Sequence, residues 1–232
     1  MNTSIKTDVV VIGGGATGAG ILRDLTLRGV SAVLVEKGDI AEGTTGRNHG
    51  LLHSGARYAV KDIESARECI SENKILKKIA RHCIEDTKGL FVTLPEDDPS
   101  YHDQLLSACR FAGIPVKAIN RKKALSLEPN LNPNLLSAMI VPDGTIDPFR
   151  LTTANIQDSV ERGNTIHTYT KITGFIMKEN VIEGITCENR QGAFSMYAKM
   201  IVNASGVWAQ EVCQLAGVEL SMMPSKGSMV II

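Results

Sequence analysis

Apolar and polar positions in the first part of the chain form two continuous apolar runs with a helical period between them. Residues 8–12 read DVVVI and residues 32–36 read AVLVE. Such β-branched runs are typical of parallel strands buried on both faces. The segment between them predicts a helix over about residues 16–28, with Gly29 at its C-terminal cap. Together the three segments predict a strand–helix–strand unit.

The middle of the chain changes its pattern twice. Apolar residues recur at near-helical spacing from Ile63 to Cys83, with charged residues between them, which predicts an amphipathic helix over about residues 62–82. Residues 86–147 are rich in proline, and we expect them to form an inserted subdomain. The short elements predicted within it are strands at 90–94 and 138–141 and helices at 103–112 and 121–127.

The remainder of the chain returns to longer elements. Asp147 is the expected N-cap and Pro148 the first residue of a helix that ends at Gly163. Residues 164–203 alternate β-rich runs with the turn sequences KEN and NRQG, which predicts a β-meander. The sequence NASGVWAQEVCQLAG then predicts a strand end, a tight turn and a helix.

The C-terminus reads as an apolar strand, Met229 to Ile232, with no turn or polar tail after it. An unpaired apolar strand is an aggregation hazard, so we expect this chain to be part of a longer protein. The alternative is a short final strand that pairs within a sheet.

Composition excludes several classes of function. Basic and acidic residues balance at 25 each, which argues against nucleic acid as a partner. The five cysteines are scattered and include no Cys-x-x-Cys pair. We therefore expect reduced thiols in a cytoplasmic protein and no metal cage. The start of the chain lacks the apolar run of a signal peptide, and no apolar segment reaches the ~18 residues of a membrane span.

A glycine motif lies between the first strand and the first helix. Gly13, Gly15 and Gly18 form G-x-G-x-x-G, and Glu36 ends the next strand 18 residues after Gly18. The first glycine permits a tight turn, the second lets the backbone approach a pyrophosphate, and the third lets helix and strand pack closely. The helix N-terminus offers amide donors to phosphates, and Glu36 can accept hydrogen bonds from a ribose. The motif in this context predicts a dinucleotide site.

Both NAD and FAD use this unit, and two features favour FAD. The chain continues into a β-meander instead of further strand–helix repeats, and IVNASG places a second small-residue turn at the end of a strand. The predicted fold is α/β with added antiparallel β. A Rossmann-like FAD-binding domain (residues 1–85 and 148–220) carries the β-meander, and an incomplete substrate or cap subdomain (86–147 and 221–232) is inserted.

With these motifs the chain resembles the FAD-dependent glycerol-3-phosphate dehydrogenases of the D-amino-acid-oxidase-like flavoprotein superfamily, above all the A subunits of the anaerobic type. The resemblance rests on DVVVIGGGATGAGILRDLTLRG, VLVEKGDIAEGTTGRNHGLLHSGARYAV, ESARECISEN, VPDGTIDPFRLT and IVNASGVWAQ…PSKGS. It covers essentially the whole chain, and residues 43–60 are its most specific part.

The resemblance implies roles for the polar, glycine-rich segment at residues 43–60. His53 is expected beside the flavin ring as the candidate base, Arg57 is expected to contact substrate phosphate, and Tyr58 follows it in the substrate site. The alternatives are a structural histidine at 53 and a surface ion pair at 57. The full set of expected cofactor-binding residues is Gly13, Gly14, Gly15, Gly18, Glu36, Lys37, Thr44, Thr45, Gly46, Arg47, Asn48, Gly50, Leu51, Ala204 and Gly206.

The resemblance implies FAD-dependent oxidation of sn-glycerol 3-phosphate to dihydroxyacetone phosphate. A histidine can take the hydroxyl proton at neutral pH, the hydride passes to flavin N5, and a guanidinium suits bidentate capture of a phosphate. Members of this type pass electrons to a quinone through partner subunits at the cytoplasmic face of the membrane. Two alternatives stay open, namely another 2-hydroxy-acid or amine oxidoreductase of the superfamily, and a non-catalytic fragment.

Overall fold

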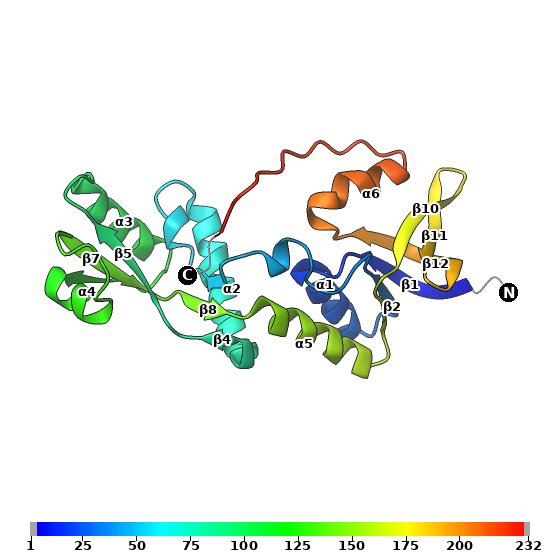
Figure 1. Ribbon diagram of the computed structural model, residues 1–232, viewed down its shortest axis with the longest axis horizontal. Helices are drawn as coiled ribbons and strands as arrows, with labels where there is room; N and C mark the ends of the chain where they lie inside the picture. Colours follow the sequence, from blue (N-terminus) through cyan, green and yellow to red (C-terminus); the bar gives the residue numbers. More distant parts are fainter. Residues whose placement is uncertain (1–3, 230–232) are drawn as a thin grey trace. The chain divides into compact units, whose positions relative to one another are not determined.

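The computed structural model describes residues 4–229, and the chain forms two compact units (Figure 1). Unit 2 contains residues 50–147, and unit 1 is formed by the chain on either side of it. The sequence placed residues 50–85 in the first domain, whereas the structure groups them with unit 2. The reason is the packing of the helix at 63–79, whose Ala66 and Ile70 lie in one core with Leu105 and Met139.

Unit 1 is built on one six-stranded sheet of the order β10-β11-β12-β1-β2-β9. Strands β12, β1, β2 and β9 run parallel, and β10, β11 and β12 form the antiparallel meander. The strand bounds are β1 Ser4–Ile12, β2 Ala32–Val35, β9 Thr165–His167, β10 Lys171–Lys178, β11 Val181–Asn189 and β12 Gly192–Asn203. The α/β fold with added antiparallel strands is therefore confirmed.

The central strands are apolar on both sides because both faces of the sheet are covered. On one face Val9, Val11 and Leu34 pack against Leu22 of α1 (Ala16–Leu27). On the other face Val10, Ile12 and Val33 pack with Ile185 and Met196 of the meander. The continuous apolar run in β1 reflects this double burial.

The helices of unit 1 begin and end close to the predicted residues. Helix α5 (Pro148–Glu161) packs beside α1, and Arg23 Nε contacts Asp158 Oδ2 at 2.8 Å. A short 3-10 turn, η4 (Gly206–Trp208), leads into α6 (Ala209–Leu215) after β12. The meander turns fall at KEN and NRQG, with positive φ at Glu179, Asn180 and Gly192.

The C-terminal part of unit 1 differs from the prediction. Residues 218–229 have no regular secondary structure and group with unit 1, whereas the sequence placed 221–232 in the cap subdomain. The strand expected at residues 229–232 lies mostly outside the described residues.

Unit 2 contains two three-stranded sheets and three α-helices. The sheet orders are β3-β8-β4 and β5-β7-β6. Helix α2 begins after Asp62, whose side chain accepts a hydrogen bond from the Ser65 amide at 3.0 Å. The bounds are β3 Leu51–Leu52, α2 Ile63–Ile79, β4 Ile84–Glu85, β5 Gly89–Thr93, α3 Ser100–Phe111, β6 Lys117–Asn120, α4 Arg121–Leu127, β7 Ser137–Val141 and β8 Gly144–Ile146.

All five cysteines are free thiols. Burial raises the pKa of the Cys187 thiol to about 12, so this thiol stays protonated in the sheet core. Among residues 4–229, no helix combines the length and apolar character needed to cross a bilayer.

Candidate functional site

The glycine-rich turn after β1 is in close contact with the end of β12. Gly13 has φ of +112°, and a Cβ atom there would lie 2.5 Å from the Ala204 carbonyl oxygen. The Gly13 amide donates to Val35 O at 2.8 Å, and the Ala204 amide donates to Ile12 O at 2.8 Å. The carboxyl ends of β1, β2 and β12 therefore meet at one edge of the sheet, where open α/β sheets bind ligands.

The other two motif glycines allow close packing around the start of α1. A Cβ at Gly18 would overlap the Gly13 carbonyl oxygen, so helix and turn can approach only with glycine at this position. Gly15 is the N-cap of α1 and has no side chain to offer the first turn. Thr45 from η1 (Thr44–Gly46) compensates, because its Oγ1 accepts the Ala16 amide at 3.0 Å.

Glu36 holds two loops with one carboxylate. Its Oε2 accepts the Gly14 amide at 2.7 Å, and its Oε1 accepts the Gly38 amide at 2.8 Å. Each carboxylate oxygen can accept more than one hydrogen bond. The side chain is therefore fixed and still able to accept from a ribose hydroxyl.

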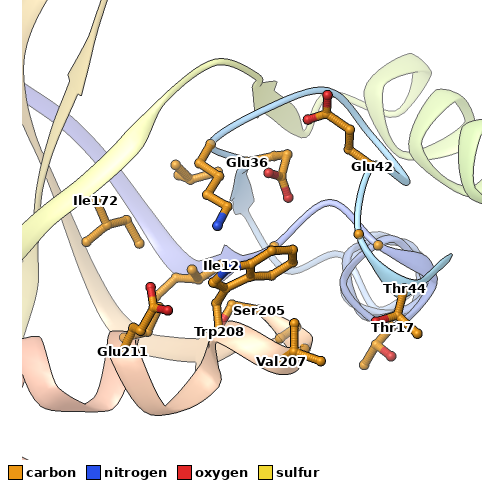
Figure 2. A pocket seen from close by; sticks show the side chains of 18 of the residues that line it. Ile12, Thr17, Glu36, Glu42, Thr44, Ile172, Ser205, Val207, Trp208 and Glu211 are labelled. Carbon is orange, nitrogen blue, oxygen red and sulfur yellow. The ribbon is translucent and has the colours of Figure 1, made fainter. Parts of the chain in front are cut away.

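These elements surround a cavity of about 1010 Å³ in unit 1. Ten of the predicted cofactor residues line it: Gly13, Gly15, Glu36, Lys37, Thr44, Thr45, Arg47, Asn48, Ala204 and Gly206. Figure 2 shows Ile12 at the end of β1, Glu36 after β2 and Trp208 from η4 around this one space. Ligand cavities commonly reach such volumes.

Five predicted cofactor residues lie elsewhere. Gly14 takes part through the hydrogen bond that its amide donates to Glu36 Oε2, and Gly18 packs behind the turn. Gly46 lies against the Ala41 carbonyl and the Phe149 ring. Gly50 and Leu51 belong to unit 2, where Leu51 lines a different cavity.

The sequence reasoning missed Trp208, which contributes a large apolar surface to the cavity. The ammonium of Lys37 lies 3.6 Å from the centroid of the Trp208 ring, a favourable cation–π distance. The other lining residues that were missed include Thr17, Glu42, Thr170, Ile172 and Glu211. Thr17 occupies a variable position of the glycine motif, and Thr170, Ile172 and Glu211 come from segments without a motif, so residue type alone did not indicate them.

A second cavity, of about 380 Å³, lies in unit 2 and brings His53 and Arg57 together. The His53 and Tyr58 rings meet edge to face with centroids 5.6 Å apart, and Arg57 Cζ lies 5.4 Å from the Tyr58 centroid. Arg57 and Tyr58 belong to the turn η2 (Ala56–Tyr58), which begins after Gly55, whose φ is +87°. Tyr58 thus lies near both His53 and Arg57.

Asp143 also lines this second cavity. It lies within the segment VPDGTIDPFRLT, but the sequence analysis assigned it no role. Its side chain is buried, with 6% of its surface exposed. Its Oδ1 accepts the Ser54 amide at 2.6 Å. Burial raises the pKa of the neighbouring Cys109 thiol to about 11, and the Asp143 charge adds to the rise. Cys109 therefore stays protonated and is no candidate nucleophile.

Two histidines outside the sequence motifs, His102 and His167, are partly buried. His102 Nδ1 lies 3.0 Å from Ser137 Oγ in unit 2. His167 packs at 5.9 Å from the Phe194 ring in unit 1, and burial lowers its pKa. Neither histidine lines one of the two cavities described above.

Comparison with known families identifies the class of protein. The FAD dependent oxidoreductase family matches residues 8–232, and the chain belongs to that family. FAD is therefore the cofactor of the class, and NAD is excluded as the alternative. The residues present fit FAD, because a glycine turn that a Cβ would fill opens into a cavity with an acidic ribose acceptor.

Individual curated relatives indicate a narrower group than the family match does. The chain is 54% identical over 230 residues to the A subunit of the anaerobic glycerol-3-phosphate dehydrogenase of Escherichia coli (strain K12), covering 98% of this chain and 42% of the relative. It is 45% identical to the A1 subunit of the corresponding Haloferax volcanii enzyme, covering 96% of this chain and 40% of that one. The resemblance inferred from the sequence is confirmed. The chain spans about two fifths of the length of these relatives.

Solved structures share the fold. Glycerol-3-phosphate dehydrogenase from Bacillus halodurans complexed with FAD matches with a TM-score of 0.66 and 27% identity, covering 91% of this chain and 36% of that one. L-Proline dehydrogenase from P. horikoshii matches with a TM-score of 0.80 and 27% identity, covering 94% of this chain and 58% of that one. The fold alone is thus compatible with more than one substrate.

Proposed function

We propose that this chain belongs to an enzyme that oxidises sn-glycerol 3-phosphate to dihydroxyacetone phosphate with FAD. The observation that carries the proposal is the cavity of about 380 Å³ lined by both His53 and Arg57. It joins a candidate base to a candidate phosphate ligand in a space suited to a small molecule. The 54% identity to one chain of a glycerol-3-phosphate dehydrogenase supports this substrate.

The residues in and beside the cavity would have different roles toward the substrate. Arg57 binds the phosphate, because a guanidinium presents paired donors that match phosphate oxygens. His53 accepts the proton of the secondary hydroxyl as the carbinol carbon loses its hydride. Tyr58 supports both side chains from beside the cavity, and Leu90 and Phe91 contribute apolar surface to its wall.

Unit 1 would hold the cofactor. The turn at Gly13–Gly15 and the start of α1 would face the diphosphate, Glu36 would accept from a ribose, and Thr45 and Asn48 would line the remainder. When bound, FAD supplies the acceptor for the hydride that leaves the substrate. Lys37 and Trp208 would close the cavity around it.

We also propose an onward path for the electrons. The Escherichia coli and Haloferax volcanii relatives are, by their names, single subunits of larger enzymes. By analogy, this chain would act with partner subunits that deliver electrons to a quinone at the cytoplasmic face of the membrane during anaerobic growth on glycerol. Co-purification of the natively expressed protein with membranes, and its release when the partner genes are deleted, would test this proposal.

Turnover with a dye acceptor tests the substrate. The protein expressed from its native gene should oxidise glycerol 3-phosphate and leave 2-hydroxyglutarate and proline unchanged. Preference for 2-hydroxyglutarate or for an amine would instead support another oxidoreductase of the superfamily, a possibility that the proline dehydrogenase match keeps open. A colourless protein that does not bind added FAD would indicate a non-catalytic fragment.

A further inference from the structure

Side chains from distant parts of unit 2 hold the backbone on both sides of His53. On the N-terminal side, Asn73 Nδ2 donates to the Leu52 carbonyl oxygen at 3.3 Å. On the C-terminal side, the Ser54 amide donates to Asp143 Oδ1 at 2.6 Å. His53 thus lies between two residues whose backbone groups are both fixed by tertiary contacts.

The segment that carries Asp143 is itself anchored to α2. Asn73, with 1% of its surface exposed, also donates to the Pro142 carbonyl at 3.2 Å. Lys77, one helical turn further along, donates to the carbonyls of Pro142 at 2.8 Å and Asp143 at 3.1 Å. The backbone that carries the Asp143 carboxylate is therefore held by contacts that do not involve Ser54.

The carboxylate of Asp143 fits into a space that is open because residue 89 is a glycine. A Cβ atom at Gly89 would lie 2.7 Å from Asp143 Oδ2, so glycine at 89 leaves the space that the carboxylate needs. Buried carboxylates are costly unless they are hydrogen-bonded. The 2.6 Å contact with the Ser54 amide supplies such a hydrogen bond and is short for an N–H donor. The Ser54 hydroxyl is buried without a partner among the described residues, so the link runs through the Ser54 amide.

We propose that Asp143 is a positioning residue for the proposed reaction. By holding the Ser54 amide, it sets the direction in which His53 enters the cavity that both residues line with Arg57. The carboxylate acts through the main chain and does not itself take the substrate proton. This inference rests on the proposed role of His53, whereas the contact with Ser54 can be tested without it.

A pair of substitutions separates positioning from charge. Asp143→Asn keeps a side-chain oxygen that can accept the Ser54 amide, whereas Asp143→Ala removes it. In the natively expressed enzyme, we expect Asp143→Ala to lower kcat by about 10- to 100-fold with little change in KM. Asp143→Asn should restore most of kcat. The matched control is Asp97→Ala, because Asp97 Oδ2 accepts the Leu94 amide at 2.7 Å on an exposed turn of the same unit.

Three outcomes would overturn the proposal: wild-type kcat in Asp143→Ala, an equal loss in Asp143→Asn, or an equal loss in Asp97→Ala.

NMR supplies a readout that needs no turnover and no alanine variant. The Ser54 amide proton should resonate far downfield in the wild type and move upfield in Asp143→Asn, while the Leu94 amide stays in place. If the enzyme oxidises no glycerol 3-phosphate but this shift occurs, the proposed function fails and the contact stands. An unshifted Ser54 amide removes the contact and the inference with it.

Discussion

At the residue scale, Gly13 combines two constraints that a side chain would violate. Its φ of +112° lies in the region that favours glycine, and a Cβ would press against the Ala204 carbonyl. The turn and the end of β12 can therefore approach only because this position has no side chain. Cofactor binding should therefore depend on this residue more than on Gly20 of the same helix–turn unit, where a Cβ meets nothing within 4 Å.

Gly13→Ala should abolish FAD binding, because the turn must move away from Ala204 and distort the cavity. The readout is quenching of the chain's single tryptophan, Trp208, which lines that cavity. The control is Gly20→Ala inside α1, where a Cβ meets nothing within 4 Å. Gly20→Ala should bind FAD normally and gain roughly 0.5–1 kcal/mol in the free energy of unfolding. Normal quenching in Gly13→Ala would contradict the proposed cradle.

Arg57 should determine the affinity for phosphate. Arg57→Lys loses the planar pair of donors while it keeps the charge, so we expect KM for glycerol 3-phosphate to rise about tenfold, equivalent to about 1.4 kcal/mol. Steady-state kinetics measure this change. The control is Arg67→Lys, because exposed Arg67 stacks on Phe111 outside the cavity. Equal KM values in both variants would assign Arg57 to a surface contact.

At the element scale, Asn164 joins three segments of unit 1. Its Oδ1 accepts the Ala32 amide at 2.9 Å, and its Nδ2 donates to Thr26 Oγ1 at 2.7 Å and to the Val30 carbonyl at 3.3 Å. The start of β9 thereby fixes the connection from α1 to β2. This contact supports β2, the strand that directly precedes Glu36.

Asn164→Ala should lower the free energy of unfolding by about 2–3 kcal/mol, because it leaves the buried Ala32 amide without its acceptor. Urea unfolding measures the loss. Asn130→Ala, at an exposed position of unit 2, should change stability by less than about 0.5 kcal/mol. Similar values for both variants would show that the Asn164 contacts contribute little.

The stability of unit 1 should also depend on pH, through His167 in strand β9. Burial lowers the pKa of His167 below its ordinary 6.5. The unfolded chain therefore binds the proton more readily, and stability falls as the pH drops below about 6.5 towards the folded pKa. His167→Phe keeps a ring beside Phe194 and removes the titration. Its melting temperature should fall less than that of the wild type between about pH 7.5 and 5.5; parallel curves would refute this prediction.

At the scale of the whole molecule, the sequence predicted the elements well and their grouping less well. The β1–α1–β2 unit and the meander were predicted because strand and helix periods and turn residues act over a few positions. The grouping of α2 with unit 2 was not predicted. Periodicity shows that one face of this helix is buried, but it does not show which hydrophobic core that face joins. Asp143 was missed for a similar reason, since its contact with Ser54 joins residues 89 positions apart.

FAD should stabilise unit 1 selectively. A ligand present at 100 times its Kd adds about 2.7 kcal/mol to the stability of the folded form. Thermal unfolding followed through Trp208 fluorescence should therefore shift to higher temperature with added FAD. ADP-ribose, which lacks the flavin, is the comparison and should shift it less. No shift of the unfolding temperature with added FAD would contradict a cofactor site in this unit.

The pairing of β1 with β12 has a consequence for biosynthesis. Ser4 lies opposite Ser195 and Ile12 opposite Asn203, so the glycine turn acquires its second wall only when both strands have left the ribosome. Translation adds roughly 5–20 residues per second. The nascent β1 therefore remains unpaired with β12 for many seconds. Loading of a flavin must therefore be a late event, and a nascent chain halted within unit 2 should emerge without colour.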